Sequence, residues 1–188
     1  MVSIISLWLP ILLSAVFVFL ASSVIHMLLT YHFKDFKKAP NEDKLMDAIR
    51  NLNIPPGDYL VPCPSDPAER KAPAFQEKMK NGPSFLMTVW GSDAMSSMTQ
   101  NLVLWFAYSI VIGIFSAYIA GRALAPGAHY LEVFRFVGFT AFTCYSVAKW
   151  QDSIWYKKSW GTTMRGTLDG LVYALLTAGT FGWLWPKM

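Results

Sequence analysis

Residues 166–185 read GTLDGLVYALLTAGTFGWLW, an apolar stretch in which every fourth residue is small. The small residues are Gly166, Gly170, Ala174, Ala178 and Gly182. Small side chains at this spacing let helix backbones approach closely in lipid, where the hydrophobic effect does not drive helices together. One carboxylate, Asp169, lies inside the stretch. The stretch therefore predicts a tightly packed membrane helix that carries one ionisable group.

The composition of the whole chain also indicates a membrane protein. Of its 188 residues, 54% are hydrophobic and 15% are charged, a balance too apolar for an ordinary soluble domain. About 20 apolar helical residues cross a hydrocarbon core of about 30 Å. Stretches of this kind occur at 5–31, 99–121, 131–150 and 167–186. We therefore expect an all-α membrane protein with a four-transmembrane-helix bundle, in which the third span is the weakest because Glu132 and Arg135 lie in its first turns.

Lysine and arginine near the span ends predict the orientation in the membrane. Basic residues follow span one and lie between spans three and four, at Lys34, Lys37, Lys38, Lys149, Lys157, Lys158 and Arg165. The connection between spans two and three offers Arg122, with Arg135 at its edge. We expect both termini outside and the long loop 34–98 in the cytoplasm. The net charge of +4 then reflects orientation, and no dense basic run with interleaved aromatics points to nucleic acid.

The first span has an alternative interpretation as a cleaved signal peptide. It lacks a basic n-region, and its apolar run is longer than signal peptides have. We therefore interpret 1–33 as transmembrane helix 1, 34–98 as a cytoplasmic cap, and 99–188 as transmembrane helices 2 to 4.

Residues 34–98 are too long for a plain connection and too apolar for a disordered linker. A helix is predicted after Asn41, which has the residue type of an N-cap, and it ends before the turn at 54–58. A short strand at 59–61, a helix at 74–80 and a strand at 85–90 follow. This pattern predicts a small α/β cap whose strands pair in either direction; the alternative is an irregular loop at the membrane surface.

Span two carries a second ladder of small residues, again four apart: Ser109, Gly113, Ala117 and Gly121. Two ladders in one chain predict that spans two and four contact each other. A homodimer interface is the competing use of the same residues.

Several polar residues are predicted at similar depth in the inner leaflet, namely His26, Gln100, Asn101, Lys149, Asp152 and Asp169. Ionisable groups inside a bundle are costly, so they pair or line a wet cavity. A histidine with one or two carboxylates can relay protons or bind a cation. In the alternative, Asp152 and Asp169 pair with Lys149, Lys157 or Arg165 at headgroup depth.

No metal or cofactor is predicted. His26 and His32 are six residues apart, which on one continuous helix places them on different faces. No nucleophile elbow, phosphate loop, zinc-protease motif or dinucleotide fingerprint occurs, so no catalytic residues are assigned.

Four segments carry a resemblance to known sequences: IPPGDY at 54–59, SIWY at 153–156, DGLVYA at 169–174 and TAGTFGWLWP at 177–186. In these the chain resembles a group of uncharacterised bacterial four-span membrane proteins. The resemblance implies placement in the bacterial inner membrane and brings no assigned activity.

Three functions follow as hypotheses. The first is a structural or accessory membrane protein that acts through helix packing or partner contacts, as a homo-oligomer or within a larger complex in the lipid bilayer. The second is a small-solute or cation/proton-coupled permeation protein that uses the inner-leaflet polar residues. The third is a membrane enzyme with a site between the cap and the helix ends.

Overall fold

The computed structural model describes residues 1–91 and 98–187. The chain divides into two compact units. Met1–Lys37 and Thr99–Met188 form one, here called the helical unit, and Lys38–Met98 form the other, here called the sheet unit. Residues 92–97, at the end of the predicted loop 34–98, lie outside the described residues.

The helical unit contains long helices joined by short connections. A 3₁₀ turn (Ile5–Leu7) leads into α1 (Trp8–Met27), and a second 3₁₀ turn, η2, spans Thr30–Lys34. The remaining elements are α5 (Met98–Ala123), α6 (Tyr130–Ser146), η4 (Val147–Lys149), α7 (Trp150–Trp155) and α8 (Trp160–Trp183).

Three helical segments are long and apolar enough to cross a membrane: Ile5–Met27, Met98–Ala123 and Tyr130–Trp155. They correspond to the first three predicted spans, and the predicted membrane class is supported to that extent. The fourth predicted span lies within α8, which is long enough at 24 residues but less apolar. Its threonines and Asp169 lower its mean hydropathy, so the count of four spans is not confirmed.

Two helix boundaries differ from the sequence prediction. The helix predicted to reach residue 31 ends at Met27, because Leu29 is extended (φ −91°, ψ 125°) and the chain then turns through η2. The second difference is that α8 begins at Trp160, so Arg165 lies on a helix and not in a loop. Both differences bear on the site described below.

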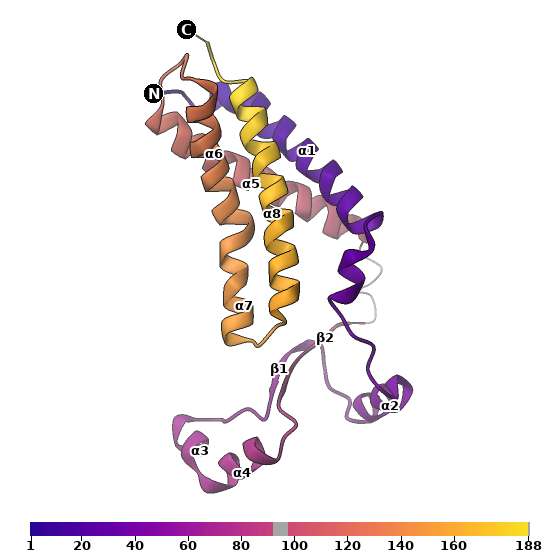
Figure 1. Cartoon of the computed structure of the whole chain (residues 1–188). Coiled ribbons are helices and arrows are strands. Elements are labelled where there is room, and N and C mark those ends of the chain that lie inside the picture. The colour runs from indigo at the N-terminus through magenta and orange to yellow at the C-terminus, as the bar shows by residue number, and fades with distance from the viewer. Residues whose placement is uncertain (92–97, 188) are drawn as a thin grey trace. The chain divides into compact units, whose positions relative to one another are not determined.

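Both termini lie at one end of the helical unit. The backbone N–H of Val2 donates to the carbonyl of Gly121, at the end of α5, with an N···O distance of 2.8 Å. The N–H of Gly127, just before α6, donates to the carbonyl of Pro186 at the same distance. The start of α1, the end of α5, the start of α6 and the end of α8 therefore meet there (Figure 1).

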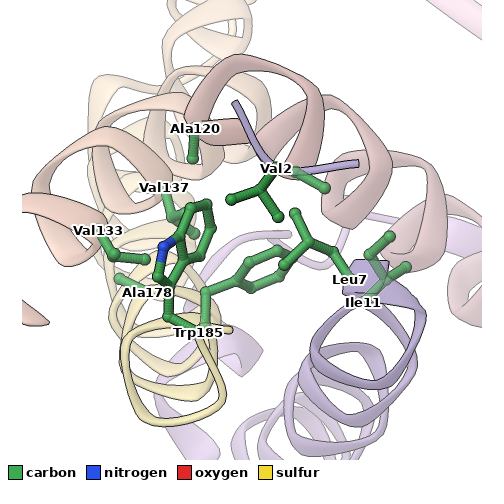
Figure 2. Close-up of a cluster of buried hydrophobic side chains, with 10 residues drawn as sticks. Val2, Leu7, Ile11, Ala120, Val133, Val137, Ala178 and Trp185 are labelled. Atoms are coloured by element: carbon green, nitrogen blue, oxygen red, sulfur yellow. The ribbon is translucent and has the colours of Figure 1, made fainter. Parts of the chain in front are cut away.

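A buried apolar cluster closes this end, as Figure 2 shows. Its members come from all four long helices and the terminal segments, namely Val2, Leu7, Ile11, Ala117, Ala120, Val133, Val137, Ala178, Phe181 and Trp185. The indole N–H of Trp185 donates to the carbonyl of Ala125 at 3.0 Å, so the polar group of this buried ring has a hydrogen-bond partner. A second cluster lies farther along the same helices and contains Val18, Ile25, Ile112, Ala141, Tyr145, Tyr173 and Ala174.

Gly170 and Gly182 of the α8 ladder face α6, which lies beside α8 in Figure 1. A Cβ on Gly170 would collide with Ser146 and lie 3.1 Å from the Cβ of Tyr145. A Cβ on Gly182 would lie 2.6 Å from the ring of Tyr130. These positions therefore admit only glycine without a shift of α6.

The glycines of the α5 ladder face α1 and the segment before it. A Cβ on Gly113 would lie 3.2 Å from Ile11, and one on Gly121 would lie 2.6 Å from the carbonyl oxygen of Val2. The glycines of each ladder thus pack on a different neighbour, so they do not form the predicted contact between spans two and four. Ala117 of α5 and Ala178 of α8 both belong to the apolar cluster.

The sheet unit contains the predicted helices and strands together with one further helix. Its elements are α2 (Glu42–Asn51), β1 (Gly57–Val61), α3 (Pro67–Lys71), α4 (Pro73–Asn81) and β2 (Phe85–Val89). The strands pair antiparallel, from Gly57 opposite Val89 to Val61 opposite Phe85, which resolves the open choice of direction.

Two local predictions in the sheet unit need correction. Asn41 precedes α2 in a left-handed conformation and makes no side-chain cap, so its predicted capping role is wrong. The unpredicted helix α3 begins at Asp66, whose side chain accepts a hydrogen bond from the N–H of Glu69 at 2.6 Å. The segment Asp66-Pro67-Ala68-Glu69 carries the N-cap and N1-proline signals that identify such a helix.

We predict that Gly170→Ala destabilises the helical unit and that Gly179→Ala does not. Overpacking costs about 1–3 kcal/mol, and the gain in helix propensity of about 1 kcal/mol applies to both variants. A Cβ at Gly179 would lie 3.7 Å from the hydroxyl of Tyr130, an ordinary contact. Unfolding by denaturant in mild detergent, followed by circular dichroism, measures the difference. Equal midpoints for the two variants would contradict the packing of α8 on α6.

Candidate functional site

The polar site of the helical unit forms where the chain leaves α1 and meets α8. We define the Asp169 cluster as the side chains of His26, Tyr31, His32 and Asp169. His26 lies in the last turn of α1, Tyr31 and His32 belong to η2, and Asp169 lies on α8. Asp169 is 4% exposed, so its carboxylate depends on these neighbours for hydrogen bonds and charge.

Two side chains of η2 contact the Asp169 carboxylate. The hydroxyl of Tyr31 donates to Oδ1 of Asp169. The Nε2 atom of His32 lies 2.9 Å from Oδ2. Consecutive residues reach both oxygens because α1 ends at Met27 and η2 turns back onto α8.

A second carboxylate fixes His32 from its other side. Nδ1 of His32 lies 2.7 Å from Oδ2 of Asp35. The other oxygen of Asp35 accepts a hydrogen bond from Nε of Arg165 at 2.6 Å. The structure thus contains a continuous chain of polar contacts that runs from Arg165 through Asp35 and His32 to Asp169.

The pKa values of Asp35 and Tyr31 show which protonation states these contacts favour. Burial alone would raise the pKa of the Asp35 carboxyl, but hydrogen bonds from His32 and Arg165, together with their charges, lower it below its usual value. Burial, and then the hydrogen bond to Asp169, raise the pKa of Tyr31 to about 12. Tyr31 is therefore a neutral donor to Asp169 at physiological pH, and Asp35 is ionised.

Aromatic stacking completes the cluster. The ring of His32 lies against those of His26 and Tyr31, with centroids 4.5 Å and 4.3 Å away. Nε2 of His26 lies 3.4 Å from the hydroxyl of Tyr173, one turn beyond Asp169 on α8. His26 is exposed, whereas His32 is largely buried and Asp169 fully so. The cluster thus has an accessible side at His26 and a closed side at Asp169.

The structure separates the six residues that were predicted to form one polar group. It brings His26 and Asp169 together. Lys149 lies nearby, with its side chain over Gly166, but makes no ion pair within the described residues. The other three lie apart from the cluster: Asp152 pairs with Lys158 at 2.7 Å, and Gln100 and Asn101 are exposed in the first turn of α5.

The prediction that His26 and His32 lie on different helix faces is wrong, because they do not share a helix. The break at Leu29 lets the two imidazoles stack. A sequence signal for this break exists, since Leu28-Leu29 is followed by the polar run Thr30-Tyr31-His32. The alternative that paired Asp169 with Arg165 also fails, because Arg165 pairs with Asp35.

The arrangement can hold a positive charge. One ligand-type atom from each of His26, His32 and Asp169 lies within 4.8 Å of the other two. Two imidazoles and a carboxylate at this separation can share a proton or coordinate a metal ion.

No protein-family model, curated protein or solved structure matches this chain.

We predict an acid-dependent loss of stability that originates at Asp35. Its folded pKa is lowered, so its stabilising contribution is present above the unfolded pKa of about 3.9 and is lost as the pH falls through the lower folded value. Asp35→Asn should remove this part of the acid dependence of the thermal midpoint. Asp47→Asn, which changes an exposed carboxylate paired with Arg50, is the matched control. An acid profile that Asp35→Asn leaves unchanged would contradict the role of Asp35.

Proposed function

We propose that this chain is a four-span protein of the bacterial inner membrane that binds a cation or proton at the Asp169 cluster and couples it to permeation. Both termini lie outside in this proposal, and the sheet unit lies in the cytoplasm. This is the permeation hypothesis of the sequence analysis with a changed set of polar residues. Tyr31 and His32 replace Gln100, Asn101 and Asp152.

The burial pattern of α8 supports its role as the fourth span. At about 1.5 Å per residue a helix of this length reaches beyond the roughly 30 Å of a hydrocarbon core. Four of the polar residues of α8 are buried against the other helices, namely Thr163, Asp169, Thr177 and Thr180. Thr177 and Thr180 also satisfy their hydroxyls by donating to the carbonyls of Tyr173 and Leu176. Lipid would therefore meet the apolar side of the helix.

The distribution of basic residues supports the orientation. The cluster lies at the end of the helical unit where Lys34, Lys37 and Lys149 also occur, opposite the end that holds the termini. Basic residues favour the cytoplasmic side. We therefore place the cluster near the inner face.

The observation that carries the proposal is the identity of the partners of Asp169. A structural ion pair would match a buried carboxylate with a permanent cation, and Arg165, one turn before it, would serve. Arg165 is committed to Asp35 instead. The groups that contact the Asp169 carboxylate directly are Tyr31, a neutral donor, and the imidazole of His32. A buried carboxylate that contacts no lysine or arginine within the described residues can accept a proton or a cation, as the carboxylates of proton and ion pathways do.

The other two hypotheses have less support. The accessory hypothesis depends on helix packing or partner contacts. The small-residue ladders are one candidate surface for self-association, and their glycines pack inside the chain. The enzyme hypothesis places a site between the cap and the helix ends, and two polar residues of the cap, Asp58 and Tyr59, are engaged within the sheet unit. Asp58 accepts a hydrogen bond from Thr88 at 2.7 Å, and Tyr59 donates to the carbonyl of Pro55 at 2.8 Å.

We predict that Asp169→Asn abolishes cation or proton flux in proteoliposomes while leaving the protein folded. The substitution keeps the shape of the side chain and removes the charge that attracts the cation. Asp152→Asn is the matched control, since it removes a carboxylate of the same unit that pairs with an exposed lysine. A pH-sensitive dye inside the vesicles measures proton uptake. Equal uptake by wild type and Asp169→Asn would contradict the proposal, as would wild-type uptake no faster than that of protein-free vesicles.

A further inference from the structure

We infer that the Asp169 cluster is a binding site for a divalent transition-metal ion of the Zn²⁺ type, with His26, His32 and Asp169 as ligands. The inference rests on the proposal that this cluster holds a cation, and it names the class of that cation. It does not depend on whether the ion crosses the membrane.

The first argument is the environment of Nε2 of His32. This nitrogen is fully buried and has no hydrogen-bond partner within the described part of the chain. Oδ2 of Asp169 lies only 2.9 Å away, but an N–H at Nε2 does not point at it, so the two atoms do not form a hydrogen bond. A buried polar atom without a partner is rare and costly. A metal ion bound by both atoms would satisfy the nitrogen and the carboxylate together.

The second argument is the support around the ligands. A metal-binding histidine usually donates its other ring N–H to a carboxylate, which fixes the tautomer and the ring orientation. Asp35 accepts from Nδ1 of His32 at 2.7 Å, and Arg165 holds Asp35. This leaves the lone pair of Nε2 directed into the cluster. Tyr31 in turn holds Oδ1 of Asp169 and leaves Oδ2 for the ion.

The third argument is the donor set and its spacing. Two imidazoles and one carboxylate suit Zn²⁺ and its first-row neighbours, whereas Mg²⁺ and Ca²⁺ prefer oxygen alone. Ligand atoms about 2.0–2.1 Å from a tetrahedral ion lie roughly 3.3 Å apart. The three candidate atoms lie within 4.8 Å of one another, so small side-chain rotations bring them to that separation.

Access to the cluster agrees with this assignment. Because His26 is exposed, the ion can enter from that side. Three protein ligands leave a fourth position for water, as in zinc sites that keep an open coordination position.

An imidazolium at His32 is the competing explanation, since a doubly protonated ring between Asp35 and Asp169 needs no metal. That arrangement would place an N–H on the line from Nε2 to Oδ2. The described geometry lacks this alignment. A metal ion bound by both atoms does not require Oδ2 to lie on the line of an N–H bond. The metal therefore accounts better for the close approach of Nε2 of His32 to Oδ2 of Asp169.

Titration of the purified full-length protein in detergent with Zn²⁺ alone, and then with Co²⁺ as a spectroscopic probe, tests the inference. We expect one ion per chain and a visible Co²⁺ spectrum typical of tetrahedral nitrogen and oxygen ligands. His26→Gln and His32→Gln should abolish saturable binding, and Asp35→Asn, a positioning variant, should weaken it about 10–100-fold. His129→Gln is the matched histidine control, because His129 caps α6 at the other end of the unit. Asp152→Asn is the matched carboxylate control.

Failure to bind Zn²⁺ would overturn the inference, and so would binding that survives both cluster histidine substitutions. His26→Gln changes an exposed residue, so it keeps the test valid even where Asp169 or His32 variants fail to fold. The outcome is separate from that of the flux measurement. Zinc binding without flux would refute the permeation proposal alone, and proton flux without zinc binding would refute the metal site alone.

Discussion

A buried carboxylate without a permanent counter-charge is the constraint on which the helical unit depends. Asp169 lies inside the packed helices, and an unsatisfied carboxylate there would cost several kcal/mol. Because α1 ends at Met27 and η2 turns back, Tyr31 donates a hydrogen bond to one carboxylate oxygen and His32 lies close to the other. The position of η2 and the burial of Asp169 are therefore linked.

The packing of α8 and the geometry of the site are parts of one arrangement. Gly170 faces α6, while its neighbour Asp169 faces the end of α1 and η2. Because the glycines allow α8 to lie close to α6, the carboxylate is held at a fixed depth and direction. Tyr173, one turn farther on, contacts His26 and also packs in the second apolar cluster. A change in the α6–α8 contact would therefore alter the site.

Hydrophobic patterning was sufficient to predict the long helices and the two strands, while the short helix α3 was missed. Long apolar runs identify α1, α5 and α6, and the prolines and glycines near Gly57 and Gly82 separate the short elements. The partners of the ladders could not be predicted, because a spacing of four indicates close approach but does not name the helix approached. Gly121 illustrates this, since its neighbour is the backbone of Val2.

The candidate site could be predicted only in part, for a reason that lies at Leu29. The presence of His26 and Asp169 in apolar segments marked them as unusual. Whether His32 belongs to the Asp169 cluster depended on where α1 ends, and helix ends are the least certain feature of a sequence pattern. A helix continued to residue 31 separates the two histidines, while a break at Leu29 brings them together. The roles of Asp35 and Arg165 could not be predicted either, because each appeared to be an ordinary charged residue of a loop.

The distance between His32 and Asp169 tests this account most directly. Solid-state NMR on the protein in lipid, with ¹⁵N-labelled histidine and ¹³C-labelled aspartate, measures the dipolar coupling between Nε2 of His32 and Cγ of Asp169. His32→Gln identifies the signal. We expect a strong coupling, because Nε2 lies 2.9 Å from Oδ2 of this carboxylate. The absence of that coupling in a folded sample would mean that η2 does not return to α8, and it would contradict the account.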